Sequence, residues 1–72
     1  MLEEFKKEME ECREIRRKMA DWSFIRSQPP RIRYALEVYV ETGDLYLASR
    51  LAGLSLSEMN DLRIKAKIPV VV

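Results

Sequence analysis

Residues 43–58 read GDLYLASRLAGLSLSE, a stretch that places one complete short helix between the end of one helix and the start of the next. Asp44 is positioned to accept the first free amide protons of a helix that runs to about Ala52. Gly43 and Gly53 flank that helix, and glycine favours helix ends because it adopts the left-handed backbone conformation without a steric penalty. The stretch therefore predicts a helical fold with tight turns at both glycines.

The helix after Gly53 begins with a capping box. Ser55 and Glu58 have the spacing at which a hydroxyl and a carboxylate each satisfy an amide at the start of a helix. Ala48 and Ala52 are small at the positions where two helices must approach each other closely. We therefore predict a helix-turn-helix around the Gly53 turn, with an ordinary helical hairpin as the alternative.

The segments before and after the predicted helix-turn-helix also have recognisable patterns. A helix from about Pro30 to Glu41 is predicted before it, because apolar residues recur at helical spacing and proline suits a first turn. After it, residues 68–72 are strand-prone, and Pro69 cannot extend a helix. This tail either pairs as a strand with a partner or a second copy, which we favour slightly, or packs back on the body as an apolar plug. The tail residues predicted to contact a partner are Val70, Val71 and Val72.

The first part of the chain, from Leu2 to about Phe24, predicts one long amphipathic helix. The rest of the chain is too short to cover its apolar stripe, so we expect a homodimer or higher oligomer held by this helix. Read as heptads, Arg16 falls at a core position, which favours a helical hairpin or a four-helix dimer interface over a long two-stranded rod. The direction of pairing stays open. The stripe consists of Leu2, Phe5, Met9, Cys12, Ile15, Met19 and Trp22.

The predicted fold is all-α: a long N-terminal helix, a Pro-Pro corner, three shorter helices that include the helix-turn-helix, and an extended C-terminal tail. Residues 1–27 form the oligomerisation and partner-binding helix, and residues 28–72 form the helix-turn-helix-like unit with its apolar tail. At 72 residues the chain is one domain at most, near the lower limit for a stable core. One cysteine and no histidine exclude an internal disulfide framework and a structural zinc site, which leaves oligomerisation as the usual reinforcement.

The 13 basic and 12 acidic residues nearly cancel, so the chain lacks the strongly basic surface of many nucleic-acid and membrane binders. A local basic surplus lies in the connector that holds Arg26, Arg31 and Arg33. We find no secretory signal and no stretch long enough to cross a membrane, so we expect a cytoplasmic protein without a membrane partner. A composition rich in Glu, Lys and Arg but poor in Asn, Gln and Cys is typical of thermophile proteins.

Catalysis is poorly supported by the sequence. The chain has no histidine, and its carboxylates lie mostly on predicted solvated helix faces. Cys12, the only cysteine, lies on the apolar stripe, where a small buried hydrophobe is a simpler interpretation than a nucleophile. We therefore predict that the chain is not an enzyme and uses no cofactor or metal.

Double-stranded DNA is an alternative partner, because a helix-turn-helix dimer can present its second helix to the major groove. Glu58 and Asp61 oppose this role, since carboxylates that face phosphates lose the counterion-release contribution to affinity. A solvated helix face is an equally good interpretation. The residues predicted for DNA binding are Arg31, Arg33, Ser57, Asn60, Arg63, Lys65 and Lys67.

The stretch from Tyr34 to Val70 contains a pattern of small, apolar and capping residues. The pattern consists of Ala35-Leu36, Tyr39, Thr42-Gly43, Ala48, Leu51-Ala52-Gly53-Leu54-Ser55, Glu58-Met59 and Lys67-Ile68-Pro69-Val70. It resembles the small antitoxin-like proteins of archaea, in which such a sequence pattern forms the end of a short helical unit. The resemblance implies a protein that neutralises a PIN-domain ribonuclease toxin by binding it and that can repress its own operon. The first 28 residues lie outside the resemblance.

Three functions follow from these observations. The one we favour is an antitoxin-like, homodimeric interaction protein that binds a toxin nuclease. The second is a small dimeric helix-turn-helix transcriptional regulator, and the third is a structural assembly module. A neighbouring gene for a PIN-type nuclease favours the first, and salt-sensitive binding of duplex DNA favours the second.

Overall fold

The fold is all-α, as the sequence predicts. The computed structural model describes the backbone of residues 2–71 and the side chains of residues 9–71. These residues form five helices and no strand: α1 (Leu2–Met19), α2 (Trp22–Ser27), α3 (Pro30–Thr42), α4 (Leu45–Ala52) and α5 (Leu56–Lys65). Within them, no helix is both long and apolar enough to span a membrane.

The predicted single helix from Leu2 to Phe24 is wrong, because the chain breaks it at Ala20 and Asp21. The backbone of Asp21 is extended, with φ −84° and ψ 92°, and its carboxylate accepts the amide proton of Phe24 at 3.1 Å. Asp21 thus caps a new helix, α2, where a periodic apolar stripe had suggested continuation. Its own amide donates to the carbonyl of Ala66 at 2.7 Å, which ties this corner to the end of α5.

The helix ends predicted for residues 43–58 are confirmed. Gly43 and Gly53 adopt left-handed conformations with φ 70° and 71°, and Asp44 accepts the amide proton of Leu47 at 3.0 Å. The capping box is complete: the hydroxyl of Ser55 accepts the amide proton of Glu58 at 3.1 Å, and the carboxylate of Glu58 accepts that of Ser55 at 3.2 Å. Local capping chemistry therefore fixes both turns.

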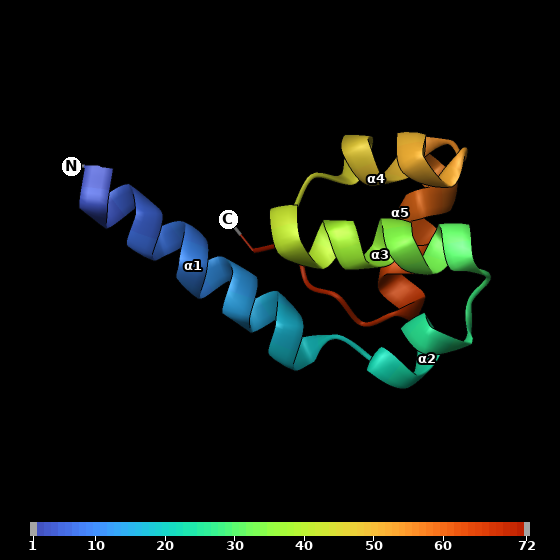
Figure 1. Cartoon of the computed structure of the whole chain (residues 1–72), viewed down its shortest axis with the longest axis horizontal. Helices are drawn as coiled ribbons and strands as arrows, with labels where there is room; N and C mark the ends of the chain where they lie inside the picture. The colour runs from blue at the N-terminus through green and yellow to red at the C-terminus, as the bar shows by residue number, and fades with distance from the viewer. Residues whose placement is uncertain (1, 72) are drawn as a thin grey trace.

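The core lies where α2, α3, α4 and α5 meet. Figure 1 shows α3 at the centre of the body, between α4 and α2, with α5 behind it, and α5 packs against α4. Each element around α3 contributes at least one buried apolar side chain to the core. The largest fully buried side chains are Ile25, Leu36, Val40, Met59 and Ile68.

The C-terminal tail begins inside this core. Residues 68–71 follow α5 without regular secondary structure, and Ile68 is 1 % exposed. Ile68 therefore acts as the apolar plug that was one of the two predicted roles of the tail. Val70 is exposed and Val71 is half-buried, whereas Val72 lies outside the described residues. Strand pairing with another chain stays a prediction for these valines.

α1 leaves the body at an angle. Figure 1 shows its N-terminal part projecting beyond the end of α3. Its main packing partner is α3, which covers only part of its length. The body thus leaves much of α1 without a neighbour in the single chain.

Candidate functional site

The apolar stripe of α1 divides into exposed and covered parts. Met9, Ile15 and Met19 are 55 %, 45 % and 60 % exposed, and Cys12 is half-buried with a free thiol. The last predicted member, Trp22, belongs to α2 and packs against the core. Leu2 and Phe5 lie in the α1 backbone, but their side chains are outside the described part of the chain.

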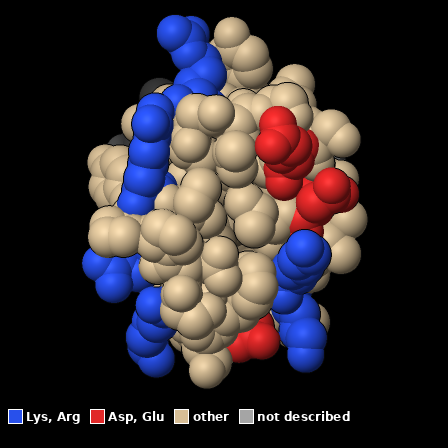
Figure 2. All heavy atoms as spheres, turned by 90° about the vertical axis from the view of Figure 1, so that its right-hand side faces the viewer, with Lys and Arg blue, Asp and Glu red and all other residues tan. Residues whose placement is uncertain are grey.

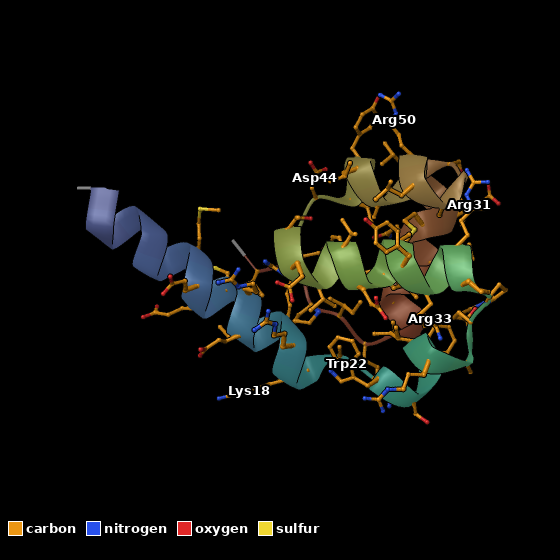
Figure 3. All side chains as sticks on the ribbon, in the orientation of Figure 1. Lys18, Trp22, Arg31, Arg33, Asp44 and Arg50 are labelled. Atoms are coloured by element: carbon orange, nitrogen blue, oxygen red, sulfur yellow. The ribbon has the colours of Figure 1, made fainter. Side chains whose placement is uncertain are left out.

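Trp22 packs against the core and also binds the end of α1. Its Nε1 donates to the carbonyl of Arg17 at 2.8 Å, which supplies a partner for a carbonyl in the last turn of α1. Figure 3 shows its ring in the corner between the end of α1 and the start of α2. Trp22 therefore fixes the angle at which α1 leaves the body.

An arginine, and not an apolar side chain, anchors α1 to α3. Arg16 is 6 % exposed, and its Nε and Nη2 donate to the carbonyls of Val40 and Glu41 at 2.8 and 3.4 Å. These carbonyls lie in the last turn of α3, where no helical amide follows to satisfy them. A Cβ at Gly43 would lie 2.9 Å from Nη1 of Arg16, so the glycine provides both the left-handed turn and room for the guanidinium.

A second, exposed ionic contact reinforces this junction. Arg17 donates through Nε to Oε1 of Glu41 at 2.9 Å and also through Nη2, and Nη1 of Arg13 lies 3.8 Å from Oε2. Exposed ion pairs contribute little to stability, but they orient the helix. α1 therefore faces α3 with Arg13, Arg16 and Arg17, and Ala20 is buried just after its end, while Ile15 and Met19 lie outside this contact.

Sequence reasoning missed this anchor. Arg16 falls on a heptad core position and breaks the heptad repeat, although a basic residue there can also mark a buried guanidinium. Its carbonyl partners are 24 and 25 residues away, so no local pattern reveals them. The one feature of the sequence that points to this anchor is an arginine on an apolar helix face, combined with a helix that ends at Gly43.

Arg31, one of the predicted DNA-binding residues, has a similar structural contact. Its Nε donates to the carbonyl of Leu51 at 2.8 Å, and a Cβ at Gly53 would lie 3.0 Å from its Nη2. Figure 3 shows Arg31 where the start of α3 meets the end of α4, with Arg33 lower on the same side of the body. Both side chains are exposed.

The predicted DNA-binding residues of α5 and its end have mixed roles. Arg63 donates to Oδ1 of Asn60 at 2.9 Å and to the carbonyl of Ile68 at 2.8 Å, so both side chains stabilise the turn that leads into the tail. Asn60 and Arg63 are half-buried. The exposed members of this set are Ser57, Lys65 and Lys67.

Charges of both signs share the surface of the body. Figure 2 shows Lys and Arg side chains along the left edge and also at the lower right of the face that it presents, Asp and Glu at the right and near the bottom, and uncharged residues over the middle. At the start of α5, Glu58 and Asp61 are exposed, although the carboxylate of Glu58 is engaged in the capping box. The described face is therefore not a uniformly basic surface of the kind that DNA favours.

The described side chains gather no metal-binding cluster. Among residues 9–71, no group of three or more Cys, Asp or Glu side chains is placed to hold a metal ion. Comparison with known proteins found no matching family model, no matching curated protein and no matching solved structure. The exposed side of α1 is the feature on which a functional proposal can be built.

Proposed function

We propose that this chain is a protein-protein interaction module that binds a second copy of itself through the exposed apolar side of α1. The proposal rests on one observation: different residues of this helix contact α3 and solvent. Polar contacts through Arg16 and Arg17 attach α1 to α3, whereas Met9, Ile15 and Met19 remain in water. A second copy offers the same apolar side chains and so removes both sets from solvent.

The energetic argument depends on area removed from water. Full burial of an Ile or Met side chain stabilises by about 1.5–3 kcal/mol, and these side chains begin half exposed, so each contributes on the order of 1 kcal/mol. Two copies double that contribution, and any additional contacts add to it. The three side chains of two copies together contribute about 6 kcal/mol, which offsets the low end of the loss of translational and rotational freedom on association, so a micromolar dimer also requires the further contacts between the two copies.

The second partner in this proposal is a toxin nuclease of the PIN-domain class. The support is the resemblance of residues 34–70 to antitoxin-like proteins, together with the exposed apolar residue Val70 beyond the body. The chain would neutralise the nuclease by binding it and would supply no catalytic group. The test is co-expression with a PIN-type nuclease encoded beside it: a stable complex with reduced ribonuclease activity is expected, and full activity with no complex contradicts the toxin assignment.

DNA binding is a second candidate function, favoured by one specific observation. α4 and α5 pack together across the turn at Gly53, as the two helices of a helix-turn-helix do, and Lys65 and Lys67 are exposed near the end of α5. If the chain binds DNA, duplex DNA binds to it at low salt and the affinity falls steeply as the salt concentration rises. The double substitution Lys65→Gln/Lys67→Gln then weakens DNA binding. Absence of binding at low salt excludes this role.

Homotypic association is tested by mass. Sedimentation at tens of micromolar is expected to give a dimer for the native chain and a monomer for the Met9→Asp/Ile15→Asp variant, because each copy would bury two unpaired carboxylates. Tyr34→Asp is the matched control, since Tyr34 is 56 % exposed on α3. This control should remain dimeric, and circular dichroism should show all three proteins folded. A monomeric native chain contradicts the proposal.

A further inference from the structure

The apolar residues of α1 have a spacing that reads the same in both directions. From Phe5 the next members follow at intervals of four, three, three and four residues, through Met9, Cys12 and Ile15 to Met19. Cys12 is the centre of this pattern. When two identical helices lie antiparallel, such a pattern brings apolar positions of one opposite apolar positions of the other along the whole overlap.

The charges of α1 are also distributed unequally along its length. Residues 3–11 contain five Glu and two Lys, a net charge of −3, whereas residues 13–18 contain three Arg, one Lys and one Glu, a net charge of +3. An antiparallel partner places the acidic half of each helix along the basic half of the other. A parallel partner places like charges together, which disfavours association. Glu41 offsets part of the basic half, but Lys18 points away from the body in Figure 3.

The charge asymmetry has a second effect, because acidic residues near the N-terminus and basic residues near the C-terminus stabilise any single helix. Charge alone therefore does not define the direction of pairing. The symmetric spacing is independent of it, since helix stability does not require apolar residues to mirror one another around Cys12. The two observations agree on one arrangement.

We propose that two copies of this chain pair through α1 in the antiparallel direction, with a twofold axis beside Cys12. This inference rests on the proposed homotypic function and specifies the direction in which the two α1 helices pair. Met9 of each copy then lies opposite Ile15 of the other, and the two Cys12 thiols face each other across the axis.

Ile15 and Met19 lie on a side of α1 that α3 does not contact, and Met9, although it shares the helix side of Arg13 and Arg16, is 55 % exposed. α3 contacts the side that carries Arg16. The N-terminal part of α1 projects beyond the body, so it can lie along the C-terminal part of the partner's helix (Figure 1). Each α1 is then enclosed between its own α3 and the second copy.

The test uses disulfide trapping in the full chain. In a Cys12→Ser background, Met9→Cys and Ile15→Cys are made as separate variants, one of them carrying a tag that changes its mass. The two variants are mixed and equilibrated in a glutathione redox buffer. Antiparallel pairing predicts a disulfide-linked heterodimer, because positions 9 and 15 oppose each other. Each variant alone should stay reduced, since two copies of position 9 are offset by roughly 9 Å along the helix axis.

The outcomes separate this inference from the proposed function. Linked homodimers of each variant, with no excess of the heterodimer, show a parallel pair, which overturns the direction and keeps the homotypic function. Met9→Cys paired with Glu14→Cys is the matched control, because position 14 lies on a different side of α1 and should not link efficiently. A native dimer that forms no Cys12 disulfide and no linked heterodimer places the interface elsewhere and overturns both proposals.

Discussion

Arg16 and Arg31 make nearly the same contact at two different helix ends. Each donates its Nε at 2.8 Å to a carbonyl in the last turn of a helix to which it does not belong, beside a left-handed glycine. They differ in burial, since Arg16 is 6 % exposed and Arg31 is exposed. The difference shows that hydrogen bonds of the same length serve two purposes here. Arg16 attaches a separate helix, whereas Arg31 covers a helix end that water also reaches.

Burial determines what the loss of each arginine costs. Without Arg16, the carbonyl of Val40 would lose its partner in a region that water hardly enters, and a buried unsatisfied acceptor carries its full desolvation penalty. Without Arg31, water can replace the donor to the carbonyl of Leu51, and the net change is small. Substitutions at Arg16, Gly43 and Arg31 test this contrast, in decreasing order of expected effect.

Arg16→Met is expected to have the largest effect. It removes both hydrogen bonds to the end of α3 while keeping much of the apolar stem, and it should cost about 2–3 kcal/mol of local stability. The measurement is hydrogen exchange of the α1 amides, supported by urea unfolding of the body. The control is Arg17→Met, which removes only an exposed contact with Glu41 and should cost less than about 0.5 kcal/mol. Equal losses of protection in the two variants would refute the distinction.

Gly43→Ala should destabilise more than Gly53→Ala, although both glycines have nearly the same positive φ. The left-handed conformation costs alanine about 1 kcal/mol at either site. At Gly43 the new methyl group also meets the buried guanidinium of Arg16 at 2.9 Å, whereas at Gly53 the exposed Arg31 can move into solvent. We expect Gly43→Ala to cost about 2 kcal/mol in total, because about 1 kcal/mol of steric strain against Arg16 adds to the cost of the left-handed backbone. Urea unfolding of both variants measures the difference.

Arg31→Met should have the smallest effect, below about 1 kcal/mol, because solvent substitutes for the lost donor. Differential scanning calorimetry against the native chain measures it, and a shift of only a few degrees is expected for a domain of this size. A loss as large as that of Arg16→Met would mean that burial does not separate the two contacts.

The predictable part of the fold was the part encoded by neighbouring residues. Ser55 and Glu58, three positions apart, were sufficient to predict the start of α5, and Gly43 and Gly53 predicted helix ends. Asp21 was overlooked because apolar residues continue at helical spacing across it, so periodicity suggested one helix where a capping carboxylate starts a second. In such cases local capping chemistry outweighs the apolar pattern.

The candidate site was less predictable, because several side chains are committed to distant backbone groups. Arg31 and Arg63 looked available for DNA, yet both donate to carbonyls of the body. Trp22 looked like a member of the exposed stripe, yet it donates to Arg17 and packs on the core. Sequence spacing indicates which residues share a helix face, but it does not indicate which other helix end lies within reach of a long side chain.

The burial of Ile68 has a consequence for the order of events during biosynthesis. The interior of the body includes this residue from beyond α5, so it stays incomplete until the ribosome has released the chain past position 68. α1 precedes the other helices along the chain and contributes little to that interior. α1 therefore leaves the ribosome before the residue that completes the interior of the body.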